Sequence, residues 1–302
     1  MFCPFCLHNT NTEKCSNCGE VLPPLYLQTH KNVKKKAIFS AVGFSGHGKT
    51  VYLATLFSEM NNRLPNIWSG FFRQGLNLDS VNTVNENVKM LEKGNLPDST
   101  RLNFPKPSIH TLKPIPHYKS ANLIIYDPPG EAFDSDTGIE SYAHFVKNVS
   151  CVVFLVSIAD LEEPKNLEIN RLLEIYYLGL GKLTAKPKKQ HLIVALTKAD
   201  LLIELFENYP AIIDHLSQPD LSALKNPKEY SRKLQAVSTE IEKFFVEELK
   251  ATSFISMAKN RFCSVNYCVV SALGNAPEDG HLSGKIQPAA VIDPLVWVLE
   301  KN

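Results

Sequence analysis

Residues 43–50 read Gly43-Phe-Ser-Gly-His-Gly-Lys-Thr50, and they follow the apolar run Ala37-Ile-Phe-Ser-Ala-Val42. The run has the length and composition of a buried strand, and Val51–Met60 has the pattern of a helix. A strand, a glycine-rich turn ending in Gly-Lys-Thr and a helix form the arrangement in which backbone N–H groups surround a phosphate. The stretch therefore predicts an α/β fold of the P-loop type, with a mostly parallel sheet and helices on both faces.

The residues of the turn have predicted roles in binding phosphates and Mg²⁺. We expect the Lys49 ammonium to reach the β- and γ-phosphates and the Thr50 hydroxyl to bind Mg²⁺, with the helix N-terminus adding a favourable dipole. We expect His47 to contribute its backbone and to leave its side chain unconstrained, and a role as catalytic base is the alternative. The remaining backbone contacts are predicted for Gly43, Ser45, Gly46 and Gly48.

A second segment reads Asn122-Leu-Ile-Ile-Tyr-Asp127-Pro-Pro-Gly130-Glu131. Its apolar strand ends at Asp127, which we expect to act on Mg²⁺ through the outer coordination sphere. The Asp-x-x-Gly spacing places the Gly130 N–H where it can sense a γ-phosphate. The segment alone is a weak signal, and its position at a strand end after the phosphate loop strengthens it.

Two further strand ends predict the base. The run Leu192–Leu196 leads into Thr197-Lys198-Ala199-Asp200. In this pattern the lysine stem packs on the purine, and the aspartate accepts from N1–H and the N2 amine of guanine. Adenine lacks both donors and would leave the carboxylate unpaired, so the pattern disfavours an ATPase. The strand from Tyr267 ends in Ser271-Ala272-Leu273, whose N–H groups are expected at the guanine O6.

Four motifs in this order resemble the translation-factor-like (TRAFAC) class of P-loop GTPases over residues 36–273. An N-terminal cysteine ribbon, Asp127-Pro-Pro-Gly-Glu131 and the ending Val291-Ile-Asp-Pro-Leu-Val-Trp-Val298 resemble, more narrowly, the bacterial double-GTPase (DO-GTPase) families. The resemblance implies a GTP/GDP-binding protein that hydrolyses GTP with Mg²⁺ as a switch, in bacterial conflict or defence systems. The alternative is a nucleotide-dependent binding module with negligible hydrolysis.

The chain departs from a minimal GTPase by an insertion before Asp127. It comprises a helical stretch, Leu76–Lys93, and a proline-rich segment, 94–118. We expect residues 76–118 to act as a switch or to bind a protein partner. The switch threonine that meets Mg²⁺ and the γ-phosphate is predicted to be Thr100, with Thr111 as the alternative. Arg101 is either an arginine supplied in cis or a surface residue.

A second departure is Glu131, which stands where related enzymes carry a water-orienting glutamine. A carboxylate only accepts hydrogen bonds and adds negative charge near the γ-phosphate. Two roles stay open, a base acting on water and a salt-bridging surface residue. In both cases we expect slow hydrolysis without a partner. Together, the predicted catalytic residues are Lys49, Thr100, Gly130 and Glu131.

The first 18 residues contain two Cys-x-x-Cys pairs: Cys3, Cys6, Cys15 and Cys18. Four thiolates are the tetrahedral set that Zn²⁺ prefers, so we expect a structural zinc ribbon without an open coordination position. Disulfides are the alternative, and His8 is a further candidate ligand. We expect residues 1–30 to form ribbon and linker, with an extended path after Pro23–Pro24, and residues 31–302 to form the GTPase domain.

Composition limits the other possibilities. With 32 basic and 31 acidic residues the net charge is +1, which gives no signal for nucleic-acid binding. The apolar runs are of strand length and too short to cross a bilayer, so no membrane association is expected. A leader is not visible at the start, and the remaining cysteines lie in apolar runs, as in reducing compartments. We therefore expect a cytoplasmic protein.

Overall fold

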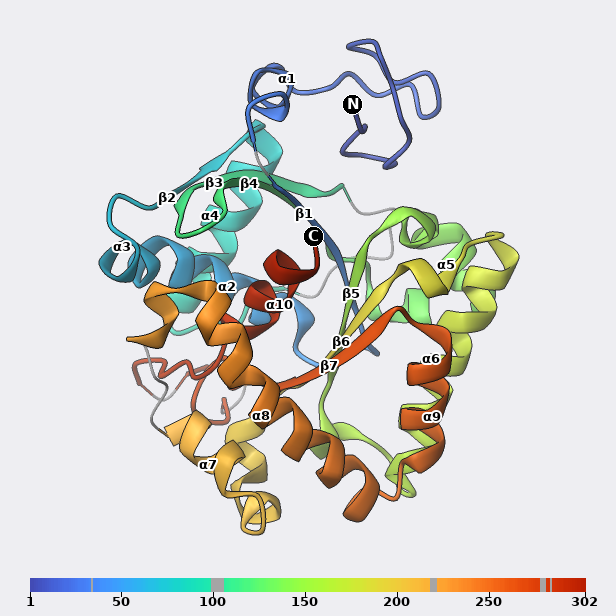
Figure 1. Cartoon of the computed structure of the whole chain (residues 1–302), viewed down its shortest axis with the longest axis vertical. Coiled ribbons are helices and arrows are strands. Elements are labelled where there is room, and N and C mark those ends of the chain that lie inside the picture. Colours follow the sequence, from blue (N-terminus) through green and yellow to red (C-terminus); the bar gives the residue numbers. More distant parts are fainter. Residues whose placement is uncertain (34, 99–105, 218–221, 278–280, 283) are drawn as a thin grey trace.

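A computed structural model describes residues 1–33, 35–98, 106–217, 222–277, 281–282 and 284–302. Within these ranges, seven strands form one sheet in the order β2-β3-β4-β1-β5-β6-β7 (Figure 1). The strands are β1 (Lys35–Val42), β2 (Phe72–Gly75), β3 (Ser108–Ile115), β4 (Lys119–Tyr126), β5 (Cys151–Val156), β6 (His191–Leu196) and β7 (Ser264–Val269).

Five of these strands are parallel, and two at one edge are not. β1 pairs in parallel with β4 and β5, and β6 pairs in parallel with β5 and β7. β3 pairs antiparallel with β4, and β2 antiparallel with β3. The predicted mostly parallel sheet is confirmed. β3 lies in the proline-rich part of the insertion, and β2 directly precedes the insertion.

Helices cover both faces of the sheet. Figure 1 shows α5, α6 and α9 on one side and α2, α4 and α10 on the other. α8 runs past β7 and contributes to both cores, with Tyr230 and Leu234 in one and Ile241 and Phe244 in the other. The long helices are α2 (Lys49–Asn62), α4 (Leu78–Glu92), α6 (Lys165–Lys182), α8 (Pro227–Glu247), α9 (Thr252–Arg261) and α10 (Asp293–Lys301), and the short ones α1 (Pro24–His30), α3 (Leu64–Ile67), α5 (Asp136–Tyr142) and α7 (Pro210–Ser217).

The strands alternate between these two cores because successive side chains point to opposite faces. In β5, Val152, Phe154 and Val156 pack on the side of α5 and α6, and Val153 and Leu155 pack on the opposite side. The closing helix α10 is buried almost completely, and its Trp297 lies in the core on the α2 side of the sheet. Because both faces are covered, the open edge formed by the carboxyl ends of the strands is the place for a ligand.

The N-terminal ribbon packs on the sheet and is not a detached unit. The buried Tyr126 hydroxyl donates to the Pro4 carbonyl oxygen at 2.7 Å, and Asn148 Nδ2 donates to the Cys6 carbonyl oxygen at 3.3 Å. Cys3, Cys6, Leu22 and Tyr26 belong to the same core as Phe145 and Val146. The expectation of an extended linker is wrong, because Pro24 starts helix α1, where a proline in the first turn loses no hydrogen bond.

No helix in the described ranges is both long enough and apolar enough to cross a bilayer.

Candidate functional site

The glycine-rich turn after β1 has the backbone conformation that surrounds a phosphate. Gly46 and Gly48 have φ values of 81° and 77°, and a Cβ at either would point into open space. Gly43 lies against β5, where a Cβ would meet the Leu155 oxygen at 2.4 Å. Gly130 likewise packs on the turn, with a Cβ position 2.3 Å from the Ser45 nitrogen. The two glycine-containing segments therefore touch, and only glycine fits at Gly130.

Lys49 and Thr50 begin α2 beside this turn. The Lys49 ammonium donates to the carbonyl oxygens of Gly43 and Phe44, each at 2.9 Å. Burial lowers the pKa of Lys49, while the carboxylates of Asp127 and Glu131 act in the opposite direction. The Thr50 hydroxyl donates to Asp127 Oδ2 at 3.4 Å. The structure thus brings together the turn, the lysine, the Thr50 hydroxyl and the Asp127 carboxylate; their roles toward phosphate and Mg²⁺ stay predictions.

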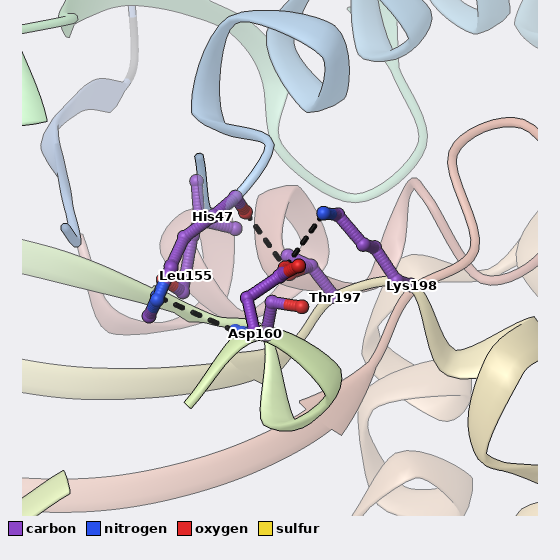
Figure 2. Close-up of polar contacts among 6 residues, drawn as sticks. His47, Leu155, Asp160, Thr197 and Lys198 are labelled. Atoms are coloured by element: carbon purple, nitrogen blue, oxygen red, sulfur yellow. Dashed lines mark hydrogen bonds and ion pairs between the residues drawn. The ribbon is translucent and has the colours of Figure 1, made fainter. Parts of the chain in front are cut away.

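The expectation of an unconstrained His47 side chain is wrong. The ring is 3% exposed and lies against β5, with Nδ1 3.3 Å from the Leu155 oxygen and 3.4 Å from the Ser157 nitrogen (Figure 2). Burial lowers the pKa of His47 to about 4, and the Lys49 charge acts in the same direction. A neutral, buried ring anchors the turn to the sheet. This placement argues against the alternative role as a catalytic base.

The Thr197–Asp200 segment follows β6 and is tied to the phosphate turn. The Thr197 hydroxyl donates to the His47 carbonyl oxygen at 3.0 Å (Figure 2). The Ser271 hydroxyl donates to Asp200 Oδ1 at 2.6 Å, and its Oγ accepts from the Gly274 N–H at 3.0 Å. The sequence assigned only the backbone of Ser271. Its side chain orients the carboxylate that is expected to recognise the base.

An apolar pocket of about 280 Å³ lies beside Asp200. It is also lined by Thr197, Lys198, Ala272 and Leu273, and by Leu96 and Pro277. Apolar walls with one carboxylate at the end suit the faces and the hydrogen-bonding edge of a purine. A second pocket of about 160 Å³ adjoins it and is lined by Ser45, Gly46, Gly48, Lys49, Thr50, Val51, Pro97, Gly130 and Glu131.

Asp160 is a site residue that the sequence analysis missed. Lys198 Nζ donates to Asp160 Oδ2 at 2.6 Å, and both side chains are little more than a third exposed (Figure 2). Burial would raise the pKa of Asp160, but its hydrogen bond and ion pair with Lys198 outweigh burial and lower it. Lys198 has φ 54°, so its backbone turns the side chain toward β5. The sequence did contain a signal for Asp160, because Ser157-Ile-Ala-Asp160 directly follows the apolar strand β5, as the predicted site segments follow theirs.

The insertion reaches both pockets. Leu96 lines the larger pocket and Pro97 the smaller one. Just before them, Asn95 pairs with His281, and Leu282 N–H donates to the Gly94 oxygen at 2.8 Å. The segment after α4 is therefore attached to the loop that follows Ser271–Leu273.

The two candidate switch threonines have different outcomes. Thr100, like Arg101, lies outside the described residues. Thr111 is inside β3, opposite Asn122, where its hydroxyl donates to the Ala121 oxygen at 3.4 Å. It is buried several residues away from the strand end at Tyr126, so it does not occupy the loop position that the alternative required. Glu131 is exposed at the rim of the smaller pocket.

The four N-terminal cysteines form a compact cluster. Their sulfurs lie within 4.8 Å of one another, with Cys3–Cys18 and Cys6–Cys15 at 3.7 Å. Metal–sulfur bonds of about 2.3 Å give sulfur separations of about 3.8 Å in a tetrahedron. Disulfides are excluded in this structure, since all four cysteines are free. The donor set fits Zn²⁺, and His8 is not part of it.

The thiols of the cluster differ in acidity. Burial raises the pKa of Cys18 to about 11. Burial acts in the same direction at Cys15, but hydrogen bonds from the N–H groups of Cys18 and Asn17 outweigh it and lower its pKa to about 7. Of these two thiols, Cys15 is therefore the more readily converted to a thiolate.

The fold and the phosphate turn define the P-loop nucleotide-binding proteins, and the segments after β6 and β7 have the pattern of the GTPase class among them. The family model described as Double-GTPase 2 (DO-GTPase2) matches residues 37–266. The chain belongs to this family, and the resemblance seen in the sequence is confirmed.

Solved structures provide more distant likenesses. The bacterial selenocysteine-specific elongation factor EF-Sec is 16% identical with a TM-score of 0.28, over 79% of this chain and 26% of that chain. The S. cerevisiae Ski7 GTPase-like domain bound to GTP is 15% identical with a TM-score of 0.35, over 91% and 51%. The same domain bound to GDP and inorganic phosphate is 15% identical with a TM-score of 0.36, and the match covers 91% of this chain and 52% of that chain. The chain thus spans from about a quarter to about half of these proteins. No curated protein matches its sequence.

Proposed function

We propose that this chain is a GTP-hydrolysing switch. The observation that supports it best is the adjacency of the two pockets, which share Gly46, Gly48 and Val51. One ends at Asp200, which selects guanine, and the other contains Lys49, which meets the phosphates. A single guanine nucleotide extends from one pocket to the other.

The phosphate end also contains the residues that would hold Mg²⁺. Thr50 would bind it, Asp127 would act from the outer sphere, and Thr100 would join them from the insertion. When bound, Mg²⁺ neutralises charge on the phosphates. Gly130 packs on the phosphate turn at Ser45, and this contact supports a role for its N–H in sensing a γ-phosphate. Release of that contact after hydrolysis is the switch.

Phosphate release under multiple-turnover conditions tests this proposal. Pure protein with Mg²⁺ should release phosphate from GTP and not from ATP, and Lys49→Ala should abolish the signal. Arg63→Ala is a matched control, because Arg63 lies at the far end of α2 and pairs with Glu59. Equal rates with ATP and GTP, or an active Lys49→Ala variant, would contradict the assignment.

A second candidate is a nucleotide-dependent binding module that does not hydrolyse. The observation favouring it is the exposed Glu131 carboxylate at the rim of the phosphate pocket, which adds negative charge where water would attack. Glu131→Gln separates the two in single-turnover assays. Slower hydrolysis in the variant identifies Glu131 as a base. Faster hydrolysis indicates that the carboxylate suppresses the reaction.

The remaining parts of the proposal concern the ribbon and the setting. Cys3, Cys6, Cys15 and Cys18 hold a structural Zn²⁺ in a ribbon of residues 1–30, and residues 31–302 form a cytoplasmic GTPase domain. A protein partner binds the ribbon or the 76–118 insertion, where Leu78 is 71% exposed. The role in conflict or defence rests on the family resemblance. Proteins that co-purify with the GTP-bound form and not with the GDP-bound form would identify the partner.

A further inference from the structure

A second hollow lies at the opposite end of the sheet from the nucleotide pockets. It measures about 640 Å³ and is lined by the segments that precede β5 and β6, residues 147–150 and 183–190, and by His8 of the ribbon. Parallel strands begin at this end and finish at the nucleotide end, so the two sites are separated by the length of the sheet.

The hollow is basic. Lys147, Lys186 and Lys189 line it together with His8, and no carboxylate is among its lining residues. All three lysines are exposed, and none is in an ion pair with any residue in the described part of the chain. In a chain of net charge +1, this is a local concentration of positive charge that the whole-chain balance conceals. Like charges gathered in a hollow repel one another and attract an anion.

The end of α6 does not account for these lysines. A helix C-terminus favours a basic residue in its last turn, and Lys182 occupies that place. Lys182 is in turn paired with Asp136 at 2.9 Å. Lys186 and Lys189 come after the helix end and line the hollow instead.

The walls of the hollow are held in place by hydrogen bonds. The Cys3 N–H donates to the His8 oxygen at 2.9 Å, and Asn148 Nδ2 donates to the Cys6 oxygen at 3.3 Å. On the opposite wall, the buried Gln190 donates to the Val149 oxygen at 3.2 Å and accepts from the Tyr176 hydroxyl at 3.2 Å. The lysines therefore project from a fixed backbone.

The chemistry of the lining indicates the ligand. Ammonium groups contact phosphates, and the lining has no phenylalanine, tyrosine or tryptophan ring on which a base could stack. Three other lysines lie at the same end of the sheet: Lys188 beside the hollow, Lys119 at the start of β4, and Lys36 in β1, whose ammonium lies over the Phe2 ring at 4.7 Å. We propose that this end of the molecule binds the phosphodiester backbone of a nucleic acid without reading its sequence, in a groove that ribbon and GTPase domain form together.

Fluorescence anisotropy with a labelled 20-nucleotide single-stranded RNA and the full chain tests the proposal across a salt series. Binding should weaken steeply with salt, and Lys186→Glu with Lys189→Glu should weaken it at least roughly 10-fold and reduce the slope of log K against log salt by about two. Arg232→Glu with Lys243→Glu is the matched control, since both exposed residues lie on α8 and the change in net charge is the same. This control should bind RNA nearly as the unaltered chain does.

Affinity for a fluorescent GTP analogue should be unchanged in both double variants, which separates this test from that of the proposed function. The same titration with labelled duplex DNA shows whether RNA or DNA is the preferred polymer. Binding of either polymer supports the proposal. Equal losses in the two double variants would show that only bulk charge acts and would overturn it. So would absence of binding at low salt, complete competition by millimolar inorganic phosphate, or binding to phosphatidylserine vesicles and not to either polymer.

Discussion

The nucleotide site and the N-terminal ribbon are built in opposite ways. The site collects side chains from four segments between residues 43 and 273, each placed by the end of a strand. The ribbon takes its four sulfurs from residues 3–18, yet its buried face is completed by Tyr126 and Phe145 of the GTPase domain. The comparison shows that a sheet can position distant residues accurately, whereas a short local module depends on its neighbour for a core.

Removing the metal should have the largest effect, because it should unfold the ribbon and leave the positions of the strand ends in place. Cys3→Ser or a chelator should unfold the ribbon, since bound Zn²⁺ supplies folding free energy on the order of 10 kcal/mol. Because the ribbon covers the core around Tyr126, the melting temperature of the whole chain should fall as well. Elemental analysis and thermal unfolding measure both effects.

Cys263→Ser is the control for this experiment, because Cys263 is exposed and outside the cluster. Protein purified without added metal should contain one zinc per chain. A metal-free preparation with an unchanged melting temperature would contradict the prediction.

Base selection tests the other region. GTP should outcompete ATP by on the order of 10³-fold, because ATP leaves the Asp200 carboxylate unpaired. Asp200→Asn should shift preference from GTP toward XTP, since the amide can donate to the xanthine O2. Competition binding of the three nucleotides provides the measurement. Wild-type protein that binds ATP as tightly as GTP would remove the basis for the guanine assignment.

Lys49→Ala should weaken triphosphate binding by roughly 100-fold or more. A hydrogen bond between charged groups contributes about 1.5–3 kcal/mol, and this ammonium is expected to meet two phosphate oxygens. Titration with a fluorescent GTP analogue checks the value. The melting temperature of the nucleotide-free variant serves as the control, and an unaltered affinity would mean that residues 43–50 do not bind the phosphates.

Tyr126→Phe should have the smallest effect and sharpen the comparison. It removes the hydroxyl that donates to Pro4 and keeps the ring stacked on Phe145 at 4.0 Å. The expected loss of stability is about 1–2 kcal/mol, because a buried carbonyl group loses its partner. Chemical unfolding measures this loss, and guanine selectivity should stay the same. A change in selectivity would show that the ribbon contact acts on the base pocket.

Much of the fold and site could be predicted because strand ends combine hydrophobic runs with short motifs of fixed chemistry. Lys49 and Thr50 follow the end of β1, Asp127 follows β4 and Asp200 follows β6, and their roles in binding a nucleotide stay predictions. The side-chain role of His47 and the Lys198–Asp160 pair could not be predicted, because they depend on β5 lying between β1 and β6. Likewise, the strand at residues 108–115 could not be predicted from the proline-rich sequence, because it depends on pairing with β4.

The attachment of Gly94 and Asn95 to the segment at His281–Leu282 has a kinetic consequence. The next two residues, Leu96 and Pro97, line the base pocket and the phosphate pocket respectively. A displacement of this short stretch uncovers both ends of a bound nucleotide at once. We therefore expect nucleotide exchange to require movement of the insertion, and a partner that holds the insertion to lengthen the residence time of the nucleotide.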